Sequence, residues 1–395
     1  MKQFLFLTST NLAANPRLVK ELRLAVDKRF ACTVLQFRLG NWSDAITEQL
    51  QQEFPSVSFI RLSALRKPFV PWLISSLLES ILSKLPYKWH TTNTLSLATG
   101  KRSLLLGLAL REISVKYDWV IAHNPATFYP AWKFAARTGA QLGIDIEDYH
   151  PGELRNVNSQ LIVRQLMRNV LPHATYTSYA SALIMQEVKK EVLFRNQAQV
   201  VLLNGFYKNE FIADQNNPTG PLRLIWFSQF VDKGRGLESI LQVIEQVKDV
   251  QLHLVGTVAN AFRDAYIRDK QNVFCHKPMK QQDLHAFLSE YDIGLALEPG
   301  RDLNNQLALS NKIMAYAQAG LFILASHTPA QTEFLKNSKL EYVQTDLKEE
   351  SLKNTIEELV NQKHDIRHTR SSRFANGRKY DWEHIAAQLS NLWDK

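Results

Sequence analysis

Polar and charged residues gather at four points where an apolar run of the chain ends. The first point is His123, and the second carries Asp145, Glu147, Asp148 and His150. Alternation along a strand places Asp145 and Glu147 on one face. Carboxylates crowded beside a histidine can transfer protons or hold sugar hydroxyls. We therefore treat His123, Glu147, Asp148 and His150 as candidates for acid–base chemistry, the alternative for each histidine being a structural role.

The same acidic cluster offers the oxygen ligands that divalent cations prefer. One short cluster, however, does not amount to a closed coordination set. We therefore expect no metal at this point.

The third point is a basic loop that follows an apolar run ending at Phe227. It contains Lys233 and Arg235 alternating with Gly234 and Gly236. Glycines allow the backbone to approach a ligand closely, and the two cations can neutralise a diphosphate. The loop has neither the dinucleotide-binding nor the P-loop spacing, and a solvated basic turn is the alternative.

The fourth point runs from Glu298 into the segment Leu309–Ser326. Ser310 precedes a short amphipathic helix, Gly320 ends it, and an apolar run follows. Serine accepts hydrogen bonds from the first amides of a helix, where amides and dipole also attract anions. Lys312 adds a positive charge, so the helix start predicts a phosphate site, with an ordinary helix-to-strand unit as the alternative. Glu298 can accept hydrogen bonds from sugar hydroxyls, or can cap the loop instead.

The rest of the chain predicts the elements that position these points. Short apolar runs alternate with amphipathic helical stretches, which is typical of parallel sheets covered by helices on both faces. The expected strands are Phe4–Thr8, Thr33–Phe37, Val57–Leu62, Trp119–Ala122, Gln141–Ile146, Ala174–Ser178 and Val200–Leu203, then Leu222–Phe227, Gln251–Val255, Val273–His276, Ile293–Leu297 and Leu321–Ala325. The expected helices include Pro16–Asp27, Ala126–Arg137, Ser159–Leu171, Leu237–Val247, Ala259–Asp269 and Gln281–Tyr291, with later helices running to the C-terminus. Two doubly wound, Rossmann-like sheets in tandem predict an interdomain cleft that binds ligands at the carboxyl ends of the strands.

One helical stretch, Ala64–His90, has two interpretations. Its apolar residues share one helical face, serines occupy much of the other face, and lysines and arginines flank it. Such a helix can lie on a membrane surface. Because the polar face is rich in serine rather than strongly basic, we favour a core helix packed on the sheet.

Composition narrows the class of protein. The 395 residues carry a formal charge of +9, which favours anionic partners. No zinc-finger spacing, RNA-binding signature or long basic block indicates nucleic acid. The only cysteines, Cys32 and Cys275, lie far apart, so a reducing compartment fits better than a disulfide framework. The N-terminus lacks a signal-peptide pattern and no segment predicts a membrane span, so we expect a cytoplasmic protein.

Taken in order, several segments resemble the retaining glycosyltransferases of the GT-B fold, in particular their family four. NPRLVKELRLA is similar to the first helix of their acceptor domain, and GIDIEDYH to its acidic–histidine turn. VVLLNGFYKNEF resembles the segment that closes that domain, and FSQFVDKGRGLESIL the basic loop around the donor phosphates. SNKIMAYAQAGLFILAS and the closing YDWEHIAAQLSNLW follow in the family's order. The resemblance covers nearly the whole chain and indicates a divergent member.

The alternating pattern restarts after ADQNNPTGP, a polar, turn-rich segment that predicts a linker, and the resemblance gives each part its role. Residues 1–212 would form an acceptor-binding domain, residues 213–221 a linker, and residues 222–378 a nucleotide-sugar-binding domain. Residues 379–395 would form a helix that crosses back to the first domain.

The resemblance also implies a reaction, in which a sugar moves with retention from a nucleotide-sugar donor to an acceptor hydroxyl. The departing diphosphate would be stabilised electrostatically, with no metal or other cofactor required. The implied donor-binding residues are Gln229, Lys233, Arg235, Gly256, Glu298, Ser310, Asn311 and Lys312. The implied catalytic residues are His150, Asp148, Glu147 and His123, with Asn15 and Arg17 on the acceptor side. The basic balance and the Ala64–His90 stretch together suggest a peripheral enzyme at the inner face of the membrane, with a glycan or lipid-linked acceptor in polysaccharide or glycolipid assembly.

Three positions depart from the family pattern. The family usually has an arginine where Gln229 stands, a ribose-binding glutamate where Ala315 stands and a histidine where Glu147 stands. The phosphate role would then fall on Lys233 and Arg235. Two alternatives stay open: a nucleotide-sugar epimerase that needs no acceptor, and a degenerate GT-B protein that binds glycan or nucleotide as a scaffold.

Overall fold

The computed structural model describes residues 1–213 and 219–394, and the chain divides into two compact units. Unit 1 contains residues 1–202 and the described residues from Gln388 onward, and unit 2 contains Leu203–Ala387. The expected linker at 213–221 includes residues 214–218, which lie outside the described residues. Residues 203–212, assigned from sequence to the first domain, cluster with unit 2, where Glu210 pairs with His285 at 2.8 Å.

Unit 1 is built on a seven-stranded sheet in the order β3-β2-β1-β4-β5-β6-β7, with every neighbouring pair parallel. Its strands are β1 (Gln3–Thr8), β2 (Ala31–Arg38), β3 (Ser58–Ser63), β4 (Trp119–His123), β5 (Gln141–Ile146), β6 (Tyr176–Tyr179) and β7 (Ala198–Val201). The strand order reverses between β1 and β4. Doubly wound sheets bind ligands at such a switch point, beyond the carboxyl ends of the strands.

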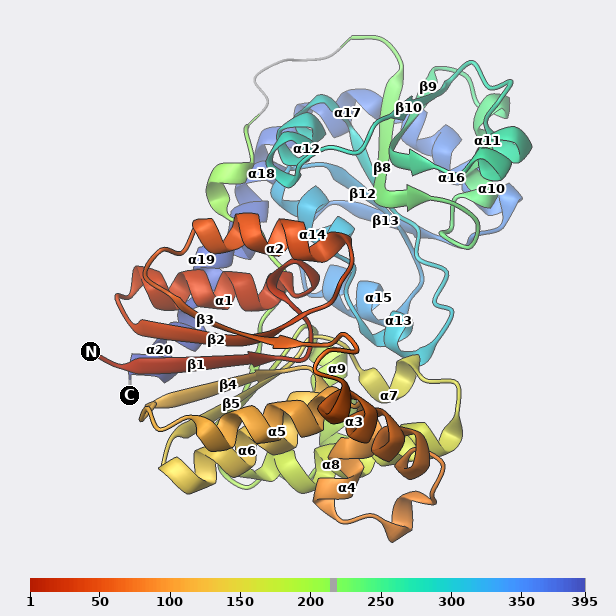
Figure 1. The fold of residues 1–395 in the computed structure, drawn as a ribbon. Helices are drawn as coiled ribbons and strands as arrows, with labels where there is room; N and C mark the ends of the chain where they lie inside the picture. Colours follow the sequence, from red (N-terminus) through yellow and green to blue (C-terminus); the bar gives the residue numbers. More distant parts are fainter. Residues whose placement is uncertain (214–218, 395) are drawn as a thin grey trace. The chain divides into compact units, whose positions relative to one another are not determined.

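Helices cover both faces of this sheet, with α1 and α2 on one side and α5 and α6 on the other (Figure 1). The helices of unit 1 are α1 (Pro16–Asp27), α2 (Trp42–Gln52), α3 (Phe69–Leu82), α4 (Thr92–Thr99), α5 (Arg102–Glu112), α6 (Pro125–Thr138), α7 (His150–Glu153), α8 (Val157–Val170), α9 (Ala182–Glu191) and α20 (Ala387–Asp394), with 3-10 turns η1 (Leu12–Ala14), η2 (Tyr87–Trp89) and η3 (Leu171–His173). α1 begins where the sequence predicts because Asn15 caps the Leu18 amide and proline, which has no amide hydrogen to satisfy, follows at Pro16.

Unit 2 repeats the architecture with a six-stranded parallel sheet in the order β10-β9-β8-β11-β12-β13. Its strands are β8 (Leu222–Val231), β9 (Val250–Val258), β10 (Val273–His276), β11 (Ile293–Ala296), β12 (Phe322–Ser326) and β13 (Tyr342–Thr345). Its helices are α10 (Glu238–Val243), α11 (Asn260–Tyr266), α12 (Gln281–Phe287), α13 (Leu303–Leu307), α14 (Asn311–Gln318), α15 (Pro329–Lys336), α16 (Glu349–Asn361), α17 (Lys363–His368), α18 (Arg370–Gly377) and α19 (Trp382–Ile385), with 3-10 turns η4 (Lys208–Glu210), η5 (Ile244–Gln246), η6 (Leu288–Glu290) and η7 (Arg378–Tyr380). The prediction of two Rossmann-like sheets is confirmed.

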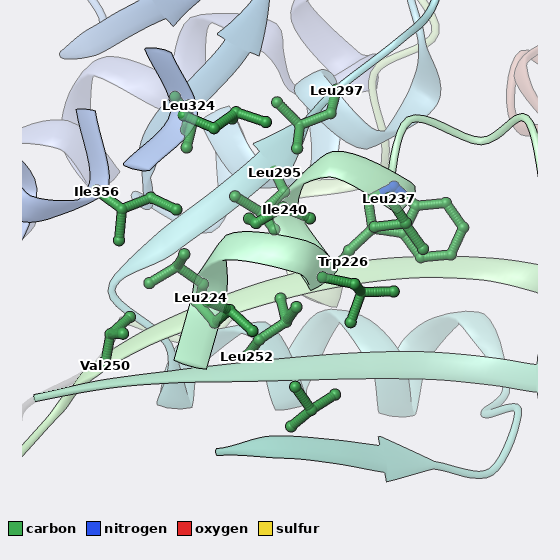
Figure 2. Packing of buried hydrophobic residues seen from close by; sticks show 14 of the residues in the cluster. Leu224, Trp226, Leu237, Ile240, Val250, Leu252, Leu295, Leu297, Leu324 and Ile356 are labelled. Atoms are coloured by element: carbon green, nitrogen blue, oxygen red, sulfur yellow. The ribbon is translucent and has the colours of Figure 1, made fainter. Parts of the chain in front are cut away.

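The core of unit 2 lies between its sheet and the helices α10 and α16. Figure 2 shows Leu224 and Trp226 of β8 packed with Ile240 of α10, Leu295 of β11 and Ile356 of α16, all fully buried. Side chains alternate across a strand, so the neighbouring Gly294 faces the opposite side. There the ring of Tyr316 from α14 occupies the space that a Gly294 side chain would need. α14 therefore packs on the face opposite α10, which fixes where its N-terminus emerges.

Three local predictions are wrong. β8 does not end at Phe227 but continues to Val231 through a register shift, because Phe230 and Val231 pair again with Thr257 and Val258. β13 is a strand where only helices were expected, since its short sequence, YVQT, lacks an apolar run.

The favoured core interpretation of Ala64–His90 is the third error. In α3, which spans Phe69–Leu82, only Ser75 is buried, and large apolar side chains lie exposed. Other helices of unit 1 already cover the sheet, so α3 packs on α4 and α5 instead. Among the described residues, no helix is long and apolar enough to cross a bilayer.

Candidate functional site

Most donor-side candidates follow the two strands that flank the switch point of unit 2. The strand order reverses between β8 and β11. The chain leaves β8 into the basic loop that holds Lys233 and Arg235, and leaves β11 into Glu298. Parallel pairing of the two strands places both exits at the same edge of the sheet.

Glu298 and Lys312 form the best-defined pair at this edge. The Lys312 ammonium donates to Glu298 Oε1 at 2.6 Å and lies over the Trp226 indole, 5.4 Å from the ring centroid. Burial would raise the pKa of Glu298, but the Lys312 charge and hydrogen bond hold that pKa below its ordinary value. Glu298 therefore stays ionised at neutral pH and fixes Lys312 in place.

The start of α14 has the predicted cap. The Ser310 side chain accepts from the Lys312 amide at 3.3 Å, Asn311 is exposed, and Gly320 adopts a φ of +70° just past the helix. Ala315 is fully buried, so the position where the family carries a ribose-binding glutamate contributes only a methyl group. The helix start thus presents amides and Lys312 beside Glu298.

The basic loop is drawn tightly against the end of β11. Gly236 has a φ of +81°, and a Cβ there would lie 1.9 Å from the carbonyl oxygen of Leu297. The Gly234 amide donates to the carboxylate of Glu238, in the first turn of α10. The Gly234 amide is therefore already bonded to a carboxylate of the protein. An anion at this loop would be bound by the side chains of Lys233 and Arg235.

Arg301 joins this group although the sequence analysis did not single it out. A Cβ on Gly234 would lie 3.2 Å from Arg301 Nη1, so the loops after β8 and β11 meet there. Arg235 also acts on the pKa of Glu298. Arg301 could have been proposed from the sequence, since it follows the end of the predicted strand by only a few residues. Directly after that strand, only Glu298 was proposed.

A cavity of about 380 Å³ opens beside Glu298 at the carboxyl ends of β11, β12 and β13. Its lining includes Gln306, Ser326, Thr328 and Asp346, which provide amide, hydroxyl and carboxylate groups. This volume is within the range of small-molecule pockets, about 300–1,000 Å³. Asp346 was missed because it follows β13, the strand that was not predicted.

Two donor candidates lie on the irregular part of the β8–β9 pairing. Gln229 is exposed within the register shift of β8. Gly256 lies inside β9 with a φ of +145°, and a Cβ there would come within 2.2 Å of the Ser228 carbonyl oxygen. The close strand approach explains the glycine at this position, whereas contact of either residue with a ligand stays a prediction.

In unit 1, the candidates near the switch point form a buried charge network. Arg17 donates to Asp145 at 3.4 Å and to the Leu202 carbonyl at 2.6 Å. His123 Nδ1 lies 3.5 Å from Asp145, and its Nε2 lies 3.3 Å from the carboxylate of Glu21 on α1. Because α1 covers the end of β4, His123 is only 2% exposed. His123 and Arg17, expected to face a ligand, instead hold strand ends together.

Mutual pairing sets the charge state of this network. Burial would lower the pKa of His123, but Glu21 and Asp145 raise that pKa to about 10. Burial would raise the pKa of Asp145, but Arg17 and His123 lower it to about 2. His123 is therefore a cation and Asp145 an anion at neutral pH. Asn15, the other acceptor-side candidate, is also buried and serves as the cap of α1.

The remaining catalytic candidates follow β5. Glu147 and Asp148 are half-buried, and burial, together with Asp145 and Asp148, raises the pKa of Glu147. His150 opens the short helix α7, where its Nδ1 lies 3.0 Å from the Glu153 carboxylate. Within the described ranges, no three His, Cys, Asp or Glu side chains are placed to hold a metal ion.

Part of the chain, including most of the donor-side candidates, matches a known protein family. Residues 235–391 match the family described as glycosyl transferase-like. This range contains Arg235, Glu298, Arg301 and Lys312. Comparison with curated protein sequences finds no match.

Solved structures similar to this chain share its fold along the whole length. Anabaena HepE in complex with UDP-glucose is 13% identical, covers 100% of both chains and has a TM-score of 0.66. Sucrose-phosphate synthase from Thermosynechococcus elongatus is 13% identical over 100% of this chain and 98% of its own, with a TM-score of 0.69. A putative UDP-N-acetylglucosamine 2-epimerase from Listeria monocytogenes is 15% identical over 98% and 95%, with a TM-score of 0.57. A sucrose-phosphate synthase and a putative epimerase thus share the fold, so the fold alone does not choose between a synthase and an epimerase.

Proposed function

We propose that this protein transfers a glycosyl group from a nucleotide-sugar donor to an acceptor hydroxyl. The observation that supports this best is a group of cations at the switch point of unit 2: Lys312 and Arg235 act on Glu298, and Arg301 lies against Gly234 of the basic loop. The glycosyl transferase-like match falls on these same residues. HepE, which has a similar fold, holds UDP-glucose in its structure.

The cations would act on the charge that develops on the departing diphosphate. Lys312 is already held by Glu298 and Trp226, so it needs no reorganisation as that charge appears. Lys233 and Arg235 would contact the phosphates from the loop after β8. The cavity beside Glu298 would receive hydroxyls of the donor. Removing one donor preorganised in this way typically lowers a rate by about 10²–10³.

The end of β5 would form the acceptor side in unit 1. Glu147, Asp148 and His150 would orient the acceptor hydroxyl, and burial, which raises the pKa of Glu147, makes this carboxyl a better proton acceptor than an ordinary one. We assign a supporting role to Arg17 and His123, which hold Asp145 at the start of this turn. Retention of configuration, and a glycan or lipid-linked acceptor of polysaccharide or glycolipid assembly in the cytoplasm, complete the proposal.

A panel of sugar nucleotides, measured by thermal stabilisation and by donor turnover with and without glycan acceptors, tests this function. At least one nucleotide should raise the melting temperature, and turnover should require an acceptor. Arg235→Ala and Lys312→Met should each lower turnover by about 10² or more. Arg268→Ala is the matched control, since Arg268 is an exposed residue of unit 2 that pairs with Asp264.

The outcomes separate the competing functions. Conversion of the donor to an epimer without an acceptor would indicate an epimerase. Tight binding with no turnover on any acceptor would indicate a scaffold. If no nucleotide stabilises the protein, or if Arg235→Ala behaves like its control, the donor site is wrong.

A further inference from the structure

We propose that the exposed face of α3 binds the surface of an anionic phospholipid bilayer. The evidence begins with the distribution of apolar surface. Seventeen large apolar residues are exposed among the described residues, and seven of them fall within residues 65–89. Scattered exposed apolar residues are normal, whereas a concentration in one segment marks an interaction surface.

These side chains form a continuous stripe. Val70, Ile74, Leu77 and Ile81 are spaced four, three and four residues apart, which places them on one side of α3. Together with Phe69 they are between 47% and 62% exposed. Ser75, the buried residue of α3, lies away from this stripe, and α3 packs on α4 and α5. The helix is therefore anchored by one side and presents its apolar side to the surroundings.

Positive charge borders the stripe at both ends. Arg66 and Lys67 precede α3, and Lys84 and Lys88 follow it, while Glu79 is the only acidic residue between residues 64 and 90. All four cations are exposed. An apolar stripe bordered by lysine and arginine matches a bilayer, because the stripe enters the acyl boundary while the cations meet the phosphates.

Aromatic residues complete the match. Phe69, the first residue of α3, is 57% exposed. Trp89, just beyond the second pair of cations, is 74% exposed. Tryptophan and tyrosine rings favour the level of lipid headgroups, where one end of the ring is wet and the other apolar.

The charge pattern favours lipid over a second copy of the chain. Pairing two copies of this face would bring cations at the helix ends toward one another, and like charges in contact disfavour association. A bilayer rich in phosphate supplies the opposite charge on all sides. The proposal does not depend on sugar transfer, because it concerns a surface of unit 1 outside the candidate site.

Vesicle co-sedimentation without any nucleotide tests the proposal. Wild-type protein should bind phosphatidylcholine vesicles that contain about one-third phosphatidylglycerol, and bind pure phosphatidylcholine much less, with binding falling as salt rises. The double variant Leu77→Asp/Ile81→Asp should lose at least about tenfold in partitioning. Its control is Val115→Asp/Leu193→Asp, which adds the same charge at exposed apolar positions of the same unit, away from the stripe. All four positions are exposed, so folding should be retained, which the melting temperature verifies.

A second pair of variants tests the charges. Lys84→Gln/Lys88→Gln should lower partitioning by about tenfold or more at low salt. Lys189→Gln/Lys190→Gln, on the exposed side of α9, is the control and should have a smaller effect. Equal loss in variant and control, or no binding of the wild type, would overturn the proposal. A dimer that Leu77→Asp/Ile81→Asp converts to monomers, with vesicle binding unchanged, would assign the stripe to self-association instead.

Discussion

Single residues in unit 1 show how charge is kept inside the protein. His123, Asp145 and Arg17 are almost fully buried, and each has an opposite charge within about one hydrogen bond's length. Removing one partner of such a network leaves an uncompensated buried charge, which typically costs about 3–5 kcal/mol. The network therefore specifies one arrangement of α1, β4 and β5 more than it adds net stability.

His123 makes this network sensitive to alkaline pH. Its folded pKa of about 10 lies above the ordinary value of 6.5. The stabilisation it contributes is therefore complete below about pH 6.5 and is lost as pH rises through about 10. We expect the free energy of unfolding to fall in this window with a slope of up to about 1.4 kcal/mol per pH unit from this one group. Urea unfolding at a series of pH values measures it.

The variant His123→Gln isolates the effect. It should be less stable at pH 7, and its stability should decline less between pH 7 and 10 than that of the wild type. His364→Gln is the control, because His364 is almost fully exposed. Identical slopes in wild type and His123→Gln would show that His123 is not charged in the folded protein.

At the same scale, sequence could propose residues but not their partners. Lys312 and Glu298 were both named, yet nothing in their spacing of fourteen residues predicts a 2.6 Å contact, which depends on how α14 packs. His123 was placed correctly at a strand end, but Glu21 of α1, which closes it off, was not considered. Residue type therefore indicated the chemistry, while burial depended on elements far away in the chain.

At the scale of elements, glycine sets how closely the loops after β8 and β11 approach. Gly236 has a left-handed φ, and it lies so close to the Leu297 carbonyl that no side chain would fit between them. We expect Gly236→Ala to destabilise unit 2 by more than about 1 kcal/mol and to weaken nucleotide binding, since it moves Arg235. Chemical unfolding and nucleotide titration measure the two effects.

Gly139→Ala is the matched control for this change. Gly139 ends α6 with a φ of +77°, but a side chain there would meet nothing within 4 Å. The loss of unfolding free energy in Gly139→Ala thus measures the backbone strain alone. Any further loss in Gly236→Ala measures the close approach to the Leu297 carbonyl. Equal losses would mean that the loop can move away from β11 freely.

Elements with a strong local signal were predicted well. α1 and β5 have the predicted bounds, because a cap and a proline mark the first, and alternating Leu142, Ile144 and Ile146 mark the second. β13 failed because its four residues are an edge strand with a half-buried, polar sequence. α3 failed differently: its periodicity was read correctly, but amphipathicity alone does not say whether the apolar side faces a sheet or the outside.

At the scale of the whole molecule, the last residues complete the first unit. Trp393 of α20 is fully buried, and its ring lies edge-on to Phe4, with centroids 5.1 Å apart. Its indole N–H donates to Tyr176 at 3.3 Å, and Lys2 donates to its carbonyl oxygen at 2.6 Å. One core therefore joins the beginning and the end of the described chain.

We expect Trp393→Ala to destabilise unit 1 by about 3–5 kcal/mol, the usual loss for a large buried aromatic side chain. Hydrogen exchange should rise across residues 1–202 and change far less within residues 203–387. Trp42→Ala, at an exposed position of the same unit, should stay within about 0.5 kcal/mol of the wild type. Uniform loss of protection in both units would instead mean that they unfold together.

This closing contact has a consequence for the protein during synthesis. Residues 1–202 are synthesised long before Trp393. Until Trp393 is added, the sides of Phe4 and Tyr176 that it contacts in the folded protein stay uncovered. Unit 2, whose residues all precede Gln388, can form in the meantime. The unit that begins first along the chain is thus the one that is finished last, and its nascent form is where chaperones would find exposed apolar surface.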